Sequence, residues 1–479
     1  MASAAEQLAG GFGWGAFSKA TDLKKRLWFT LGALVVYRIG SYIPIPGIDP
    51  QVLAEIFNAQ RGGILGMFDM LAGGALSRMT LFALNIMPYI SAAIIIQLMT
   101  AVSPTLEALK KEGPSGRQKL NQYTRYLTLA LALFQSYGIA LGLQGSSGQS
   151  GALVLVNPIV FQVTTVVTLT GGTMFLMWLG EQITARGIGN GTSLIIFAGI
   201  VANLPSALAA LLELGRTGAL STIFIILMLI IAVGVIAAIV FLERAQRRIL
   251  VQYPKRQVGN KMFGGQSSHL PLKINTSGVI PPIFASSLLL QPLTVASFGA
   301  LGDEPGWLQA ISTYLAHGQP LYIALYVALI VFFAFFYTAV VFNPAETADN
   351  LKKHGGFVPG IRPGKNTADY LDHVLTRLTV IGAAYLAVIC VLPEILISQY
   401  SVPFYFGGTS LLIVVSVTMD TVAQIHSHLI AHQYEGLIKK AKLKPTREGA
   451  AARLAARGAG GSGSGERSLL DRLLGRKGG

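Results

Sequence analysis

Ten apolar stretches alternate with polar segments along the chain, and each approaches the length needed to cross a bilayer. About 20 apolar residues, at a helical rise of 1.5 Å per residue, span a hydrocarbon core roughly 30 Å thick. The pattern therefore predicts an all-α membrane protein with ten transmembrane helices. They are expected near residues 27–43, 79–102, 126–143, 159–180, 192–212, 219–242, 277–298, 320–342, 378–397 and 404–425.

Positive charge is distributed unevenly between the two sides of this pattern. Of the 37 Lys and Arg residues, 33 lie in the N-terminal arm (1–26), the C-terminal tail or every second loop. The exceptions are Arg61, Arg78 and Arg216 in the opposite loops and Arg38 within the first stretch. Because cytoplasmic loops collect Lys and Arg, we expect a multi-pass inner-membrane protein with both termini in the cytoplasm. We expect no cleavable signal peptide, because the N-terminal arm is polar and basic.

Composition supports the membrane assignment. Charged residues make up 12% of the chain, against about 25% in a soluble domain. A net charge of +15 is also typical of nucleic-acid binding, but the membrane topology explains most of it. The remaining basic charge favours contact between the cytoplasmic loops and acidic lipid, ribosomal RNA or an acidic partner.

Two inside loops are longer than the topology requires. Residues 243–273 hold seven Lys and Arg, and residues 343–377 hold five. Alternation from Arg248 to Tyr253 predicts a hairpin in the first loop. Simple positive-inside charge explains the basic residues, whereas the length favours a docking surface. The tail, 441–479, has a flexible Gly/Ser composition that fits either a natural or an engineered linker.

The outer segment between the first two predicted helices contains a short apolar run, residues 64–71, flanked by glycine pairs. It is too short to span a membrane. It fits either an interfacial helix or a re-entrant segment, and the latter is tolerated only where protein surrounds it.

The sequence offers few groups for chemistry. A charge at a helix centre costs about 2.5–3.5 kcal/mol on insertion scales. Arg38, Glu181 and Asp420 all fall near helix ends, which argues against an ion-coupled transporter. There is no P-loop, HExxH or GxSxG motif, Cys390 is the single cysteine, and the three histidines near the end of the last helix lack further ligands. We expect no enzyme activity, metal or cofactor, and energy supplied by a partner or a gradient.

Isoleucine recurs in several predicted helices that Gly and Pro interrupt. A ring of β-branched apolar side chains can close a pore by excluding water, although lipid-facing isoleucine is the commoner arrangement. The candidates are Ile86, Ile90, Ile94, Ile196, Ile283 and Ile413.

At these residues the sequence resembles the SecY family, the channel subunit of the bacterial protein translocase, over roughly residues 20–442. No single run decides the resemblance; the order and number of the runs do. The runs are Tyr37–Gly47, Gly73–Arg78, Met87–Ser91, Glu112–Gly113, Gln122–Tyr126, Gly180–Ile183, Gly187–Gly191, Ser268–Pro271, Asn343–Lys353, Phe357–Gly364 and Phe404–Leu412.

The resemblance implies a channel domain, 27–440, built from two pseudo-symmetric five-helix halves, 27–212 and 219–425. It implies an hourglass pore for unfolded secretory proteins and a lateral gate between helices 2, 3, 7 and 8, through which hydrophobic segments enter lipid. It also implies a plug at about 62–74 that blocks the resting pore, which favours the re-entrant interpretation. The plug residues are Ile64, Leu65, Gly66, Met67, Phe68, Asp69, Met70 and Leu71.

The resemblance further implies a pore ring and a set of partners. Five ring positions hold the isoleucines 86, 90, 196, 283 and 413, and the sixth holds Thr192, whose hydroxyl adds one polar group. Arg256 and Arg362 are implied to dock the motor ATPase SecA and the ribosome, because a planar guanidinium binds phosphate and carboxylate bidentately. SecE and SecG are the implied partners in a heterotrimer. The residues alone leave open a small-solute transporter, which would need a central polar site, and an insertase without a continuous pore.

Overall fold

A computed structural model describes residues 21–59, 69, 72–145, 147–148, 151–152, 154–218, 221–253, 256–258, 261–263, 267–299, 319–400 and 408–443. The chain divides into two compact units, one of Arg26–Val422 and the other of Met1–Lys25 with Ala423–Gly479. The site described below lies in the first unit.

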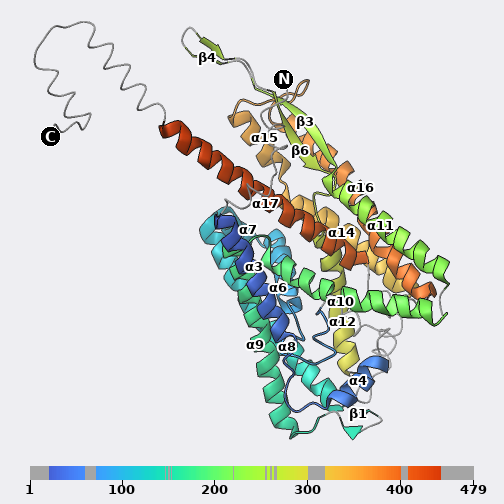
Figure 1. Cartoon of the computed structure of the whole chain (residues 1–479). Coiled ribbons are helices and arrows are strands. Elements are labelled where there is room, and N and C mark those ends of the chain that lie inside the picture. The colour runs from blue at the N-terminus through green and yellow to red at the C-terminus, as the bar shows by residue number, and fades with distance from the viewer. Residues whose placement is uncertain are drawn as a thin grey trace, which may run out of the picture. The chain divides into compact units, whose positions relative to one another are not determined.

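Each of the ten predicted membrane stretches overlaps a helix, with bounds that differ by several residues in places (Figure 1). Seven of the described helices are long and apolar enough to span a membrane, or eight if α6 and α7 form one bent span. The helices that precede the hairpin are α3 (Thr21–Gly40), α4 (Pro50–Ala59), α6 (Met87–Val102), α7 (Pro104–Lys111), α8 (Pro114–Gly145), α9 (Pro158–Arg186), α10 (Gly191–Arg216) and α11 (Thr222–Arg244). Those that follow it are α12 (Ile280–Gly299), α14 (Pro320–Val341), α15 (Pro344–Lys353), α16 (Lys365–Tyr400) and α17 (Gly408–Leu443).

The second span begins later than predicted but ends where it was expected. It was expected to be helical from residue 79, but α6 begins at Met87 because Met79 and Asn85 have φ of 41° and 50°, outside the helical region. Its last residue is Val102, as predicted, and Ser103 is extended, as the residue before a proline prefers. Consequently α6 and α7 meet at a bend of 100°.

The first long loop is the predicted hairpin. Strand β3 (Gln246–Gln252) pairs antiparallel with β6 (Ser267–Lys273), from Gln246 opposite Lys273 to Gln252 opposite Ser267. Beyond them β4 (Arg256–Val258) pairs with β5 (Lys261–Phe263). A third pair, β1 (Ser147–Gly148) with β2 (Gly151–Ala152), lies between α8 and α9.

The second long loop is largely helical. It contains α15, whose first turn is capped by the Asn343 side chain, and the N-terminal turns of α16, which begins at Lys365. These turns are polar, so hydropathy gave no signal for them.

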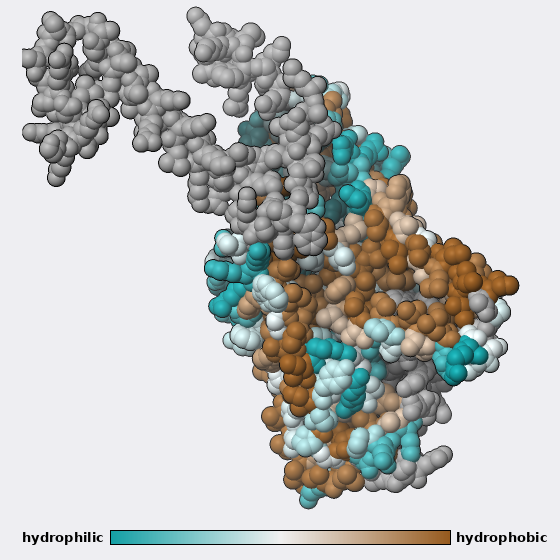
Figure 2. Space-filling view, viewed as in Figure 1, coloured by the Kyte–Doolittle hydropathy of each residue, from teal (hydrophilic) through white to brown (hydrophobic). Residues whose placement is uncertain are grey.

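The outer face of α11 is apolar. Ile226, Ile230 and Val233 are 53%, 63% and 65% exposed, and Figure 2 shows brown surface across this part of the molecule. On a membrane helix, exposed apolar side chains of this kind are suited to contact with lipid tails.

Candidate functional site

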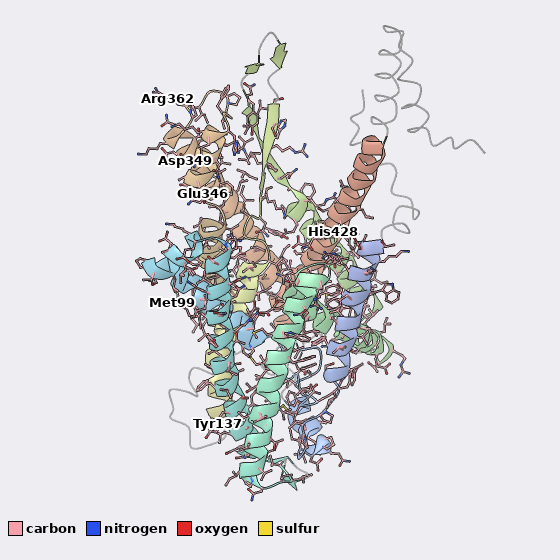
Figure 3. All side chains as sticks on the ribbon, turned by 90° about the vertical axis from the view of Figure 1, so that its left-hand side faces the viewer. Met99, Tyr137, Glu346, Asp349, Arg362 and His428 are labelled. Atoms are coloured by element: carbon pink, nitrogen blue, oxygen red, sulfur yellow. The ribbon has the colours of Figure 1, made fainter. Side chains whose placement is uncertain are left out.

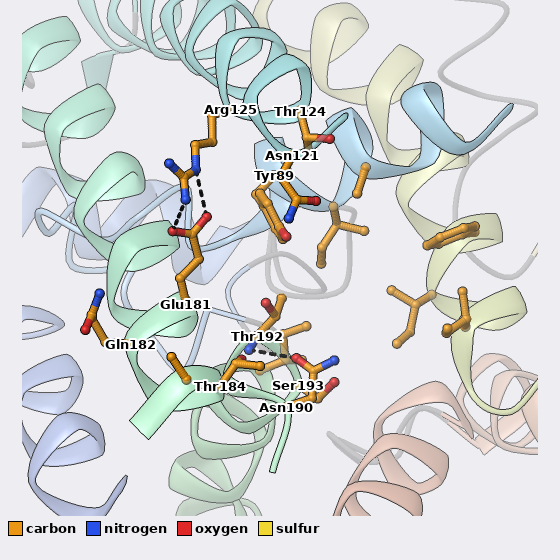
Figure 4. Close-up of a pocket in the computed structure, with 17 residues that line it drawn as sticks. Tyr89, Asn121, Thr124, Arg125, Glu181, Gln182, Thr184, Asn190, Thr192 and Ser193 are labelled. Atoms are coloured by element: carbon orange, nitrogen blue, oxygen red, sulfur yellow. Dashed lines mark hydrogen bonds and ion pairs between the residues drawn. The ribbon is translucent and has the colours of Figure 1, made fainter. Parts of the chain in front are cut away.

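A cavity of about 630 Å³ lies among α6, α8, α9, α10 and α12. Its wall on α12 is apolar and consists of Ile280, Ile283 and Phe284. The opposite wall is polar, as Figure 4 shows for the labelled side chains. The polar lining residues are Tyr89, Asn121, Thr124, Arg125, Glu181, Gln182, Thr184, Asn190, Thr192 and Ser193.

Four of the six predicted ring residues line this cavity, namely Ile90, Thr192, Ile196 and Ile283. The isoleucines do not lie over an exposed outer face. Those at positions 86, 90, 196 and 413 are 1%, 6%, 6% and 2% exposed. All four belong to one apolar cluster, against which Ile283 packs. The structure therefore gathers these side chains from α6, α10, α12 and α17, with Ile86 immediately before the first residue of α6. Their role as a pore ring stays a prediction.

Thr192 is positioned by a close approach of α9 and α10. A Cβ on Gly191 would overlap the carbonyl oxygen of Gly180, so glycine is required for this contact. The Asn190 side chain accepts a hydrogen bond of 3.1 Å from the Thr192 amide and so caps α10. These two features place Thr192 at the cavity wall.

An ion pair joins two helices of the polar wall. Arg125 of α8 donates from Nε to Glu181 Oε1 at 2.9 Å and from Nη2 to Oε2 at 2.6 Å. Glu181 was predicted to lie near a helix end, but no ion-pair partner was predicted for it. The partners are 56 residues apart, so no helical spacing indicates the contact. Bidentate geometry fixes the guanidinium plane, although exposed pairs contribute only about 0–1 kcal/mol.

Of the predicted plug residues 64–71, the structure describes only Asp69. Its Oδ1 accepts from the Ser77 amide at 2.6 Å, and its backbone oxygen accepts from the Gly74 amide at 2.9 Å. Burial raises the pKa of Asp69, opposed by the hydrogen bonds from Ser77 and the charge of Arg78.

The C-terminal end of the predicted plug is held by α3. Arg38 Nη1 donates to the Gly73 carbonyl at 3.0 Å, and the Tyr37 hydroxyl donates to the Ala72 carbonyl at 3.4 Å. Arg38 lies in the last turn of α3, near the helix end as predicted. Its contact fixes the position of Gly73.

The two long loops form one body. Gln252 of β3 exchanges backbone hydrogen bonds of 2.9 and 3.0 Å with Phe357, just after α15. Hairpin residues Ile249 and Leu272 share an apolar cluster with Leu371 and Leu375 of α16. A force applied to either loop therefore acts on the same packed unit, which we call the loop body (residues 246–273 and 356–378).

Charge is unequal within this region. The first loop, 243–273, has seven basic residues and one acidic residue, whereas 343–377 has five basic and four acidic residues. Arg362 is exposed, and Figure 3 shows it at the same end of the molecule as Glu346 and Asp349 of α15. Arg256 is the first residue of β4, and the structure describes its backbone only. The hairpin is therefore the more electropositive part of the loop body.

Comparisons with known proteins agree with this architecture. The family model described as SecY matches residues 80–422. The protein translocase subunit SecY of Escherichia coli (strain K12) is 59% identical over 424 residues, covering 88% of this chain and 95% of that protein. The corresponding subunit of Rickettsia typhi (strain ATCC VR-144 / Wilmington) is 58% identical over 430 residues, covering 89% and 99%.

Solved structures show the same fold. One, described as a protein conducting channel, aligns with a TM-score of 0.62 at 19% identity, covering 85% of this chain and 92% of that one. Another, Sec61 in a canine ribosome–channel complex, aligns with a TM-score of 0.60 at 18% identity, with the same coverage. The chain therefore belongs to the SecY family, whose members are multi-pass membrane proteins of bacteria, and is the protein-conducting channel of the Sec translocase, a transporter rather than an enzyme.

Proposed function

We propose that an unfolded polypeptide enters the cavity from the side of the loop body and passes between the six ring residues. The observation that carries this proposal is that four ring positions line the cavity while four isoleucines are buried in one apolar cluster. A cavity with a polar wall next to an apolar constriction admits a polar chain and restricts ion leakage. The side of the loop body is then the cytoplasmic side, and the positive-inside charge pattern assigns both termini to the cytoplasm.

The plug, about residues 62–74, closes the outer half of the resting channel in this proposal. The contacts of Arg38 and Tyr37 with Gly73 and Ala72 at its C-terminal end support a fixed anchor on one side of a movable element. The paired left-handed glycines Gly73 and Gly74, with φ of 69° and 80°, allow the sharp turn at that anchor.

Hydrophobic segments leave sideways between α12 and its neighbours. Helices α6, α8 and α12 are the second, third and seventh predicted membrane helices, between which the lateral gate was predicted. Support comes from the contacts of α12 with both α6 and α8. The apolar wall of the cavity lies on α12, so a signal segment would lie against the helix that must move.

Partners dock on the loop body. The excess of basic residues in the hairpin supports contact with ribosomal RNA or with an acidic surface of the motor SecA, with Arg256 and Arg362 as contact residues. SecE and SecG complete the proposed heterotrimer, and anionic lipid meets the remaining basic charge.

Photocrosslinking tests the path. A photoreactive residue at position 90 or 283 should label a secretory chain stalled during transport, because both positions line the cavity. Ile226 of α11, 53% exposed on the outer face, is the matched isoleucine control and should label lipid. Equal labelling of the stalled chain from all three positions would refute the proposed path.

A further inference from the structure

A buried polar cluster lies where the hairpin joins the gate helix α12. Asn275 Nδ2 donates to Glu243 Oε1 at 2.6 Å and to the Gly278 carbonyl at 3.0 Å. Ser277 Oγ donates to Asn275 Oδ1 at 3.0 Å. Asn275 and Ser277 are 3% and 4% exposed, so every polar atom of Asn275 depends on these contacts. We call Glu243, Asn275, Ser277 and Gly278 the polar junction.

The polar junction stabilises the short connection between β6 and α12. Six residues, 274–279, separate the end of β6 from the start of α12. Ile274 N donates to the Ala245 carbonyl at 3.1 Å, which ties this connection to the first residues after α11. Gly278 has φ of +66°, and the turn there directs the chain into α12. Such a short connection, held by the Ile274 amide and the Asn275 side chain, has little freedom to absorb a displacement of the hairpin.

Helix α16 packs closely against the polar junction. A Cβ on Gly382 would lie 3.1 Å from the Ile274 carbonyl oxygen and 3.6 Å from Asn275 Cα, so the two backbones are nearly in contact. The N-terminal turns of the same helix carry the apolar cluster of the loop body. The hairpin, α16 and the start of α12 therefore meet at one point.

A second buried donor lies on α16. The Tyr385 hydroxyl is buried and makes no hydrogen bond among the described residues, and the charge of Glu243 acts on it. Lys273 and Asp420 are the charged groups that act on the Glu243 carboxylate. Coupling between distant sites requires an element with two arrangements that both sites bias. In the proposal that follows, this element is Glu243, which exchanges between Asn275 and Tyr385.

We propose that the polar junction transmits docking on the loop body to the gate helix, with Asn275 as the positioning residue. This inference rests on the proposed docking and gating roles. With the gate closed, Asn275 binds Glu243 and holds the first turn of α12. Docking displaces the hairpin, Glu243 turns to Tyr385, and α12 is released from α6 and α8.

The test measures gate separation directly. Spin labels replace Ile95 of α6 and Leu288 of α12, which are 40% and 44% exposed, in the complete complex in lipid nanodiscs. Their distance is recorded with and without ATP-bound SecA, and SecA affinity is measured in parallel. In the otherwise unaltered channel, docking should lengthen the distance. If it does not, the proposed gate itself is wrong, whatever the polar junction does.

Variants then distinguish the role of the polar junction from that of the gate. Asn275→Ala should bind SecA within twofold of the unaltered channel yet lose at least half of the docking-induced change. Glu243→Gln keeps the Oε1 acceptor and should behave as the unaltered channel. Tyr385→Phe should leave the resting distance unchanged and reduce the docked change.

A full distance change in Asn275→Ala would overturn the proposal, as would a loss that merely follows weakened SecA binding. If Asn275→Ala fails to fold, Tyr385→Phe decides the matter by the same measurement, since it removes one hydroxyl and leaves the resting contacts intact.

Discussion

Replacing Ile413 by asparagine should weaken the closed state of the channel. Ile413 is 2% exposed and lies in the apolar cluster with Ile86, Ile90 and Ile196. The variant places an amide where the surrounding side chains are apolar. In the open state, water or a polypeptide in the pore would form hydrogen bonds with that amide. The substitution therefore penalises the closed state more than the open state.

The magnitude follows from the surroundings. A buried polar group without a partner costs about 1–3 kcal/mol, and about 1.4 kcal/mol corresponds to tenfold in an equilibrium constant. The closed-to-open ratio should therefore fall roughly 5- to 150-fold. The buried hydroxyls of Ser410 and Ser416, three residues away on either side, set the lower end, since they can accept from the amide.

The assay is export of a reporter that carries a defective signal sequence, normalised to the amount of channel in the membrane. Ile413→Asn should raise export, whereas Ile413→Val keeps a β-branched apolar side chain and should not. Ile226→Asn, on the outer face of α11, controls for a nonspecific effect of an amide in the membrane. Export no higher than in the unaltered channel, or equal in both asparagine variants, would refute the ring assignment.

Two further predictions concern local structure. Gly191→Ala should lower the thermal unfolding midpoint in detergent, at a cost of about 1–3 kcal/mol from overpacking against Gly180; Gly171→Ala, with open space around it, should not, and equal midpoints would contradict the close contact. Because burial raises the pKa of Asp69, its ionisation penalises the folded arrangement: the penalty grows as pH rises through the raised pKa and is absent well below it. The Gly74 amide donates to the backbone oxygen of Asp69 rather than to its carboxylate. Its exchange rate, corrected for the intrinsic pH dependence, should therefore show more protection at low pH, and Asp69→Asn should abolish this dependence.

Much of the architecture follows from hydropathy and charge, because a membrane segment must be both long and apolar. Each predicted stretch overlaps a helix, and alternation around Arg248 located the hairpin. Family membership also decides the function, setting aside the transporter and insertase interpretations that the residues alone left open.

Other features have no signal in the sequence. The start of α6 was predicted too early because residues 80–86 are as apolar as the helix that follows, and only Asn85 and Pro88 mark the boundary. The first turns of α16 are polar and so lie below any hydropathy threshold. The Arg125–Glu181 pair joins residues 56 positions apart, and such contacts depend on how helices pack.

The central claim is that a polypeptide passes in single file through the isoleucine ring, and disulfide mapping tests it most directly. Cysteine replaces Ile196 in a Cys390→Ala background, and a single cysteine is moved along a secretory chain stalled at a fixed length. Crosslinking confined to a few adjacent substrate positions, shifting in step as the stalled chain is lengthened, is the predicted result. Uniform crosslinking along the chain, or none at any length, would contradict the account.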